Sequence, residues 1–234
     1  MQLTPFKQEL FEQFARIGSA LSHGKRLEML EYLAQRERSV DALASLTGLS
    51  VANASQHLKQ LKQAGLVETR RQGKYVCYRV ADPQVVALLD LQRRVAERRL
   101  AEVQQMVSSY LGARDSLEPI DADQLLARSA SGDVMVLDVR PPEEYAAGHL
   151  PGAVNITPDQ LEMAIAGLPR DRQIVAYCRG PYCVLSFDAV KLLRERGFDA
   201  RRLDAGLPEW RLAGLPVEVD PEGSRLPCQI QPDS

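Results

Sequence analysis

Apolar positions in the first third of the chain recur every three or four residues, which is the spacing of a helix with one buried face. Ser39 and Ser50 stand where a serine hydroxyl caps the first free N–H groups of a helix, and Gly48 and Gly65 stand where the chain turns. These patterns predict four helices, over 6–21, 25–34, 40–46 and 51–64.

The next stretch, 66–80, has the composition of a hairpin. Residues 66–70 and 75–80 are expected to form two strands, joined by the basic tip Arg71-Gln72-Gly73-Lys74, in which the glycine suits a turn. A long helix is expected over 83–111. Helix, short helix, turn, helix and basic hairpin in this order predict a mainly α winged helix-turn-helix domain over 1–111.

Beyond a short polar linker at 112–119, apolar strands alternate with helices. This alternation is typical of an α/β domain with a mainly parallel sheet, which we expect over 120–217. A polar tail with prolines, 218–234, is expected to be loosely ordered. The expected strands are 134–137, 153–155, 173–177 and 201–203, and the expected helices are 142–147, 158–166 and 184–196.

The composition, with 45% hydrophobic and 26% charged residues, is that of an ordinary globular protein. No apolar run has the length of a membrane span, and Met1 is not followed by a signal-peptide pattern, so no membrane partner is expected. The four cysteines are too few and too scattered for a disulfide framework, which favours a reducing cytoplasm. They are Cys77, Cys178, Cys183 and Cys228.

Charge divides the chain in the same place as the hydrophobic pattern. Residues 1–114 contain 17 lysines and arginines against 11 acidic residues, whereas residues 115–234 contain 12 against 20. A basic half joined to an acidic half indicates two domains with different partners, of which the basic one is a candidate for nucleic-acid binding.

Cys178 lies between the expected strand 173–177 and the helix that begins near Val184. The loop between them turns backbone N–H groups inward beside a helix N-terminus, a setting that lowers the pKa of a thiol and favours a reactive thiolate. Arg179 adds a positive charge that could hold an anionic sulfur species. A buried cysteine at a strand end is the alternative. The loop consists of Arg179, Gly180, Pro181, Tyr182 and Cys183.

The first domain resembles the ArsR/SmtB-like repressors over most of 6–110. The order and spacing of four stretches together produce this resemblance. They are Lys25-Arg26-Leu27 with Leu30, the stretch from Ser50 to Leu58, Ala64-Gly65-Leu66-Val67, and the stretch from Arg70 to Arg79. The resemblance implies a homodimer formed by the first helix and the helix at 83–111, which would present two recognition helices to a palindromic operator in double-stranded DNA.

Candidate DNA contacts lie on the recognition helix and the wing. Side chains in the first turns of the helix would reach base edges or phosphates, and basic wing residues suit the DNA backbone or the minor groove, with a solvated hairpin as the alternative. His57 is a DNA contact by the resemblance, although a packed or phosphate-bonded histidine fits equally well. The candidates are Ser50, Val51, Asn53, Ala54, Ser55, Gln56, His57, Lys59, Arg70, Arg71 and Lys74.

Metal sensing, which many ArsR-like repressors perform through cysteines, has no candidate ligands here. Residues 1–24, 39–47 and 83–111 contain no cysteine, and the three histidines and four cysteines form no cluster with metal-ligand spacing. We therefore expect no metal and no cofactor. Cys77 is the only thiol of the first domain and is expected to point inward from its strand, so sensing is assigned to the second domain.

Residues 119–216 resemble a single-domain rhodanese. The resemblance implies that Cys178 attacks a sulfane sulfur, holds it as a persulfide that the loop amides stabilise, and passes it to an acceptor thiol. The four matching motifs are Asp138-Val139-Arg140 with Glu144-Tyr145, the stretch from Gly148 to Asn155, the Cys178 loop, and Gly206-Leu207-Pro208-Glu209-Trp210.

Several residues near this loop have alternative interpretations. Asp138 and Arg140 are expected to brace the site or to pair with Glu144. His149 is expected to be a structural residue rather than a general base, and Trp210 a core residue.

Two positions depart from related families. Val184 stands where phosphatases of this fold carry an arginine, which argues against phosphate chemistry. Cys183 stands where many thiosulfate-using rhodaneses have a basic residue. It is either a resolving thiol for a persulfide on Cys178 or a small residue that fills the first turn of the helix.

The sequence therefore predicts a cytoplasmic, homodimeric transcriptional regulator, a repressor, whose rhodanese-like domain senses or transfers sulfane sulfur through Cys178. The expected partners are operator DNA, a second copy of the chain, and reactive sulfur species or a thiol acceptor. One alternative is a sulfurtransferase enzyme that uses the winged helix for dimerisation or localisation. Another is arsenate reduction at Cys178, since the loop could hold an oxyanion.

Overall fold

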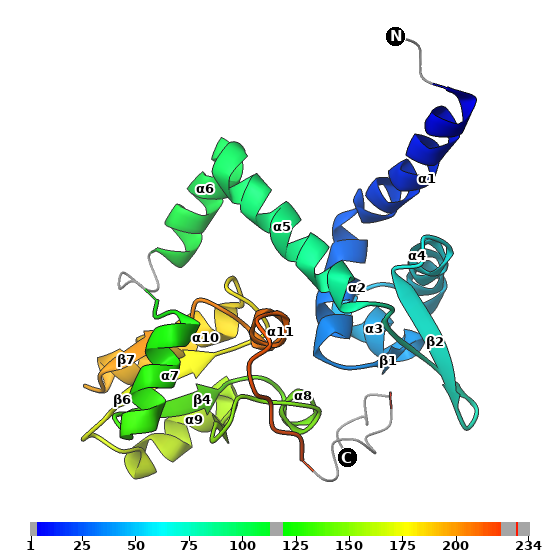
Figure 1. The fold of residues 1–234 in the computed structure, drawn as a ribbon. Helices are drawn as coiled ribbons and strands as arrows, with labels where there is room; N and C mark the ends of the chain where they lie inside the picture. The colour runs from blue at the N-terminus through cyan, green and yellow to red at the C-terminus, as the bar shows by residue number, and fades with distance from the viewer. Residues whose placement is uncertain (1–3, 113–118, 221–227, 229–234) are drawn as a thin grey trace. The chain divides into compact units, whose positions relative to one another are not determined.

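A computed structural model describes residues 4–112, 119–220 and Cys228. The chain forms two compact units, one of residues 1–89 with 227–234 and one of residues 90–226, and each is described by itself (Figure 1). The expected linker falls largely on 113–118 and the expected tail largely on 221–234, which lie outside the described residues apart from Cys228. The domain boundaries expected from the sequence stay predictions.

The first unit is a winged helix-turn-helix, as predicted. Its sheet is antiparallel with the order β1-β3-β2, so the β2–β3 hairpin forms the wing. The elements are α1 (Pro5–Leu21), α2 (Gly24–Gln35), β1 (Arg38–Ser39), α3 (Val40–Thr47), α4 (Val51–Gln63), β2 (Val67–Gln72) and β3 (Tyr75–Val80).

Local signals place α3 and α4 where the sequence pattern predicted them. The Ser39 hydroxyl accepts a hydrogen bond from Ala42 N at 3.2 Å, and the Ser50 hydroxyl accepts one from Asn53 N at 3.3 Å. Gly48 ends α3 with a φ of 66°, a conformation that favours glycine. The packed core beneath these helices includes fully buried Met29, Leu30, Leu43, Leu58 and Leu61.

The single helix predicted over 83–111 is wrong, because the chain breaks at Leu100. Helix α5 (Pro83–Arg99) ends there, and α6 (Ala101–Met106) continues into a π-helical turn at Val107–Leu111, so the chain changes direction between α5 and α6 (Figure 1). Leu100 has extended backbone angles, φ −106° and ψ 109°. Gln104 Nε2 donates to the carbonyl of Glu97 at 2.8 Å. This side-chain bond satisfies one of the carbonyls that the break frees.

The second unit is built around a parallel sheet with the order β5-β4-β6-β7, which confirms the predicted α/β class. Sequence reasoning missed its first helix, α7. The strands are β4 (Val134–Asp138), β5 (Val154–Asn155), β6 (Gln173–Tyr177) and β7 (Ala200–Arg202). The helices are α7 (Ala122–Ser131), α8 (Pro142–Ala146), α9 (Pro158–Ala164) with a 3-10 turn at Ile165–Gly167, α10 (Val184–Glu195) and α11 (Leu207–Leu212).

Helices cover both faces of this sheet. Along β6, Ile174 and Ala176 belong to the core under α9 and α10, whereas Val175 belongs to the core under α7 and α11. Side chains of a strand alternate between faces, so a central strand with two packed faces is apolar at successive positions, here from Ile174 to Ala176. Burial on both faces holds the end of β6 in place. The loop at 178–183, called the reactive loop below, starts there.

Hydrogen bonds to the second unit hold Pro216, just before the expected tail, and Glu218, the first residue of that tail. Trp210, which is buried as expected, donates from Nε1 to the carbonyl of Pro216 at 2.8 Å. His149 and Glu218 exchange two backbone hydrogen bonds of 2.9 Å. Within 4–112, 119–220 and 228, no helix is long and apolar enough to cross a membrane.

Candidate reactive-sulfur site and DNA-binding surface

The loop after β6 carries two cysteines that meet. Cys178 follows the last residue of β6 and is 1% exposed, and Cys183 is the N-cap residue of α10. The two form a disulfide, with Cα atoms 6.0 Å apart. A helix N-terminus favours negative charge, so either sulfur is stabilised as a thiolate when the pair is reduced. A bond between these two sulfurs is what the resolving-thiol alternative for Cys183 requires.

Arg179, expected to hold an anionic sulfur species, is bonded to a carboxylate. Its Nε lies 3.0 Å and 2.9 Å from the two carboxylate oxygens of Glu144, which is fully buried on α8. Glu144 offsets the charge of the guanidinium, and the pair attaches the reactive loop to α8. The anion site is therefore weaker than the sequence alone indicates, which leaves the loop amides to stabilise a sulfur anion.

Asp138 and Arg140 brace the strand ends beside this loop. Arg140 Nη2 lies 2.6 Å from Asp138 Oδ2 and 2.7 Å from the carbonyl of Gly148, and both side chains are fully buried. The Tyr177 hydroxyl donates to the same Asp138 oxygen. Burial first, and then Asp138, raises the pKa of Tyr177, so the phenol stays protonated as a donor.

The motif at α11 is pressed against the backbone of the reactive loop. A Cβ added at Gly206 would collide with the carbonyl group of Arg179 and lie 2.6 Å from Gly180 N. Glu209 Oε2 accepts a hydrogen bond from Gly206 N at 2.9 Å, which fixes the start of α11. Glycine is therefore the residue that the packing at 206 admits, because two backbone segments touch there.

Tyr182 extends from the reactive loop to α5. The Arg93 guanidinium lies 5.7 Å from its ring centroid, and Glu97 accepts a hydrogen bond from its hydroxyl. Burial first, and then this bond, raises the pKa of Tyr182. Sequence reasoning missed Arg93 and Glu97, because the α5 periodicity marks them only as polar helix positions. A cavity of about 650 Å³ beside the loop is lined in part by these three residues.

The recognition helix α4 exposes most of its predicted DNA contacts. Val51 is 46% exposed. Ala54 was wrongly predicted, because it is fully buried with Leu58 and Leu61 on the inner face of α4 and cannot reach a base. The spacing of these three positions, at helical intervals, was the signal that could have excluded it. The exposed predicted residues are Ser50, Val51, Asn53, Ser55, Gln56 and Lys59.

His57 is partly buried and packs against His23, with ring centroids 4.5 Å apart. Burial, followed by the neighbouring charges of His23 and Arg26, lowers its pKa, so the ring favours the neutral form. A packed histidine was one of the two alternatives that the sequence left open, and these contacts favour it.

The wing presents fewer unpaired charges than the sequence indicates. Arg70 Nε lies 2.7 Å and 3.0 Å from the two carboxylate oxygens of Glu37, which raises the pKa of Arg70 and offsets its charge. Arg71 and Lys74 are exposed, and Lys74 Nζ lies 5.2 Å from the ring centroid of Tyr75.

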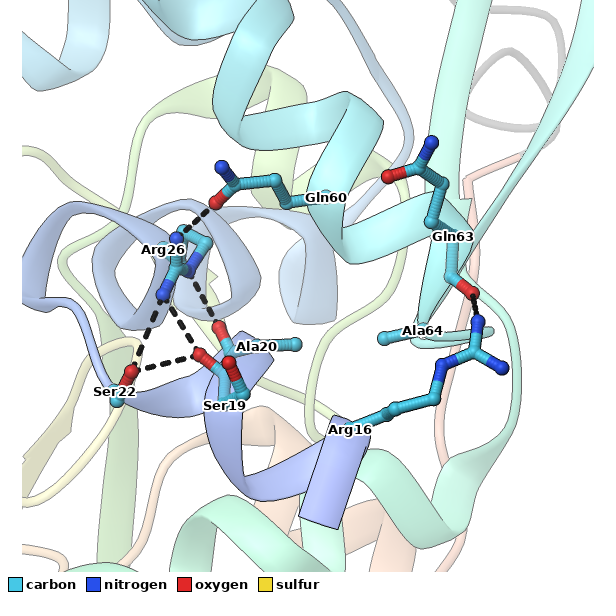
Figure 2. A pocket seen from close by; sticks show the side chains of 8 residues that line it. All are labelled: Arg16, Ser19, Ala20, Ser22, Arg26, Gln60, Gln63 and Ala64. Atoms are coloured by element: carbon cyan, nitrogen blue, oxygen red, sulfur yellow. Dashed lines mark hydrogen bonds between the residues drawn. The ribbon is translucent and has the colours of Figure 1, made fainter. Parts of the chain in front are cut away.

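Two arginines that sequence reasoning did not single out for a role join α1 to the back of α4, around a cavity of about 610 Å³ (Figure 2). Arg26 donates to the carbonyls of Ala20 at 2.5 Å and Ser19 at 2.9 Å, and to Gln60 Oε1 on α4. Arg16 on α1 donates to the carbonyl of Gln63 at 2.9 Å. The N-terminal helix is thereby bonded to the recognition helix, whose outer face carries the candidate DNA contacts.

A second disulfide joins Cys77 to Cys228, with Cα atoms 5.7 Å apart and 151 residues of sequence separation. Both cysteines are buried, 0% and 1% exposed. The expectation that Cys77 has no partner thiol in the first unit is wrong. Cysteine spacing could not reveal this pair, because the fold rather than local sequence brings its members together.

Comparison with known proteins agrees with these two units. Residues 23–69 match the family model described as bacterial regulatory protein, arsR family, and residues 121–213 match the model described as rhodanese-like domain. The HTH-type transcriptional regulator Rv0324 of Mycobacterium tuberculosis is 48% identical over 212 residues, which cover 91% of this chain and 93% of that protein. A protein named sulfurtransferase from Allochromatium vinosum is 34% identical over 106 residues, 44% of this chain and 96% of its own length.

Among solved structures, the homodimeric winged helix-turn-helix DNA-binding domain (fragment 1-100) of Mb0332 from Mycobacterium bovis is 42% identical, covers 44% of this chain and 94% of its own, and has a TM-score of 0.40. The long match to Rv0324 spans both units, and the two family models account for each unit separately. This chain therefore belongs to the family of HTH-type transcriptional regulators in which an ArsR-type winged helix is followed by a rhodanese domain.

Proposed function

We propose that this regulator binds a palindromic operator as a homodimer in the cytoplasm and represses transcription from it, and that sulfane sulfur taken up at Cys178 changes its affinity for that operator. The observation that carries the proposal is the pairing of Cys178 with Cys183 in a loop whose tip, Tyr182, contacts α5. The loop thus combines a reactive thiol, a second thiol within reach and a contact to a helix of the regulator.

The chemistry at the loop has two steps. The Cys178 thiolate attacks the outer sulfur of a low-molecular-weight persulfide RSSH, so that a Cys178–sulfur bond forms, the sulfur–sulfur bond of RSSH breaks and RSH leaves. The Cys183 thiolate then attacks the Cys178 sulfur, a disulfide forms and the sulfane sulfur leaves as hydrogen sulfide. Two thiol sulfurs are oxidised and the sulfane sulfur is reduced, so the persulfide is the oxidant.

Helix α5 is the proposed route from the loop to the DNA. It begins at Pro83, three residues after wing strand β3 ends at Val80, and its C-terminal half contacts Tyr182 through Arg93 and Glu97. A change at Cys178 and Cys183 that moves Tyr182 also changes the hydrogen bond and the cation–π contact on α5. Such a change shifts DNA affinity only as far as it stabilises one arrangement of the regulator over another.

Exposed apolar side chains support the proposed homodimer. Helix α1 exposes Phe6 by 73%, Phe11 by 50% and Phe14 by 59%, and α5 exposes Leu91 by 56% and Val95 by 47%. Apolar side chains at helical spacing that no neighbour covers are typical of an interface. Arg26 and Arg16 connect α1 to α4, so a dimer formed through α1 would set the spacing of two recognition helices.

The partial match to a protein named sulfurtransferase favours a second candidate, a sulfurtransferase enzyme that uses the winged helix for dimerisation or localisation. Both candidates predict a persulfide on Cys178, so the two differ in their effect on DNA. Arsenate reduction has less support, because Glu144 offsets the charge of Arg179, which would hold the oxyanion.

The test uses the reduced full-length protein and an operator selected from random duplexes. Glutathione persulfide should change operator affinity of the wild type by a measurable factor in fluorescence anisotropy, and Cys178→Ser should abolish the change that arises at this loop. Cys183→Ser should keep the persulfide, detected by mass spectrometry, but fail to form the loop disulfide. Sulfur on Cys178 with unchanged operator affinity would favour the enzyme, and equal loop modification of wild type and Cys178→Ser would contradict both candidates.

A further inference from the structure

The first unit carries a thiol pair of its own, which the proposed function does not use. Cys77 lies on β3, in register with Ser39 on β1 and with Arg70 on β2. Cys228 pairs with it from 151 residues further along the chain. The pair therefore lies at the sheet that contains the wing, with Cys77 in the wing strand β3.

The backbone holds Cys228 in this place independently of its sulfur. Ser39 N donates to the carbonyl of Cys228 at 2.6 Å, and Cys228 N donates to Gln72 Oε1 at 3.3 Å. The same Gln72 oxygen lies 3.5 Å from Cys77 Sγ. These polar contacts keep the two sulfurs near one another when the bond is reduced, and a high effective concentration of one thiol at the other favours reversible disulfide formation.

We propose that Cys77 and Cys228 are a second sulfur-reactive site, which low-molecular-weight persulfides convert from the dithiol to the disulfide, and that this disulfide weakens binding to the operator. One thiolate attacks the outer sulfur of RSSH and releases RSH, which leaves a protein persulfide. The second thiolate attacks the protein sulfur of that persulfide and releases hydrogen sulfide. RSSH and two thiols thus give RSH, hydrogen sulfide and the disulfide, with the sulfane sulfur as oxidant.

The disulfide changes what is attached to the wing. It binds Cys228 covalently to β3, and the carbonyl of Cys228 also accepts a hydrogen bond from Ser39 N, the N-cap residue of α3. The bond therefore restrains the wing strand β3 relative to α3, and it lowers DNA affinity as far as the restrained arrangement differs from the one that fits DNA.

The test isolates this pair in the full-length protein. Cys178→Ser/Cys183→Ser keeps only the second pair, and the matched control adds Cys228→Ser. After reduction, glutathione persulfide should produce a cross-linked Cys77–Cys228 peptide under non-reducing mass spectrometry and a several-fold loss of operator affinity, both reversed by dithiothreitol. The triple variant should show neither. The same peptide is sought in the wild type, so detection of the cross-link does not depend on the folding of the variants.

Three outcomes would overturn the proposal. Alkylatable thiols at Cys77 and Cys228 after persulfide treatment would mean that the pair is not reactive. A disulfide that dithiothreitol cannot reduce in the folded protein would mean that the bond is permanent and structural. A reversible cross-link with unchanged operator affinity would remove its effect on DNA binding. Each is distinct from a failure at Cys178, since that residue is absent from the variant tested.

Discussion

The two cysteine pairs differ in how the chain brings their members together. Cys178 and Cys183 are five residues apart in one loop, whereas Cys77 and Cys228 are separated by 151 residues. In the chain-entropy model the shorter loop stabilises the folded state by about 2 kcal/mol and the longer one by about 5 kcal/mol. The local pair can thus change redox state with little effect on stability, whereas the distant pair links redox state to the stability of the winged-helix unit.

Removing each disulfide in turn tests this difference between the two pairs directly. Under oxidising conditions Cys228→Ser should lower the free energy of unfolding by up to about 5 kcal/mol, and Cys183→Ser by about 2 kcal/mol, because the longer loop loses more entropy on closure. Guanidinium unfolding with and without reductant measures both. Equal losses in the two variants would contradict this difference between the pairs. The free energy of unfolding of reduced wild-type protein should match that of the double variant Cys183→Ser/Cys228→Ser.

In the second unit, breaking the buried ion pair beside the reactive loop should destabilise the fold more than breaking an exposed ion pair. Asp138→Asn removes the Asp138 carboxylate from its ion pair with the fully buried Arg140 and should cost about 3 to 5 kcal/mol in thermal or denaturant unfolding. Glu162→Gln, which breaks the exposed pair with Arg196, is the matched control and should cost less than about 1 kcal/mol. A small loss for Asp138→Asn would show that the brace is not needed.

Arg71 and Lys74, which have no close carboxylate among the residues that the structure describes, should contribute more to DNA affinity than Arg70. Arg71→Ala or Lys74→Ala should each reduce the slope of log affinity against log salt by about 1, the effect of one lost phosphate contact. Arg70→Ala should change the slope less, because Glu37 offsets its charge. Anisotropy titrations at several salt concentrations measure the slopes. A larger change for Arg70→Ala would mean that its pair with Glu37 opens on DNA.

The smallest effect concerns the contact between the reactive loop and α5. Tyr182→Phe removes the hydroxyl that donates to Glu97 and should reduce the coupling between persulfide treatment and operator affinity by about 1 kcal/mol. A double-mutant cycle with Glu97→Gln separates this bond from the packing of the ring. If the two substitutions act additively on the response, the bond does not transmit it.

Most of the correct predictions came from short stretches of sequence, that is, from capping residues and from the spacing of apolar positions. Capping serines and apolar periodicity located α3 and α4, and the predicted strand and helix on either side of the Cys178 loop correspond to β6 and α10. The break at Leu100 was not predictable, because no proline or glycine marks it. The Cys77–Cys228 pair and the Arg70–Glu37 pair arise from tertiary packing, which residue spacing does not encode. Ala54 was predictable as buried, since it shares the spacing of Leu58 and Leu61.

The lack of a side chain at Gly206 has a mechanical consequence for the proposed sensing. Backbone already touches backbone between Gly206 and the segment Arg179-Gly180, so the reactive loop has no room to move toward α11. An added sulfur atom at Cys178 occupies volume that a close-packed interior does not have free. In the proposed mechanism the loop would therefore move away from α11, and Tyr182 would carry that displacement to its contacts on α5. The close contact at Gly206 therefore blocks movement of the loop on one side, so an added sulfur atom would displace the loop only toward the other side.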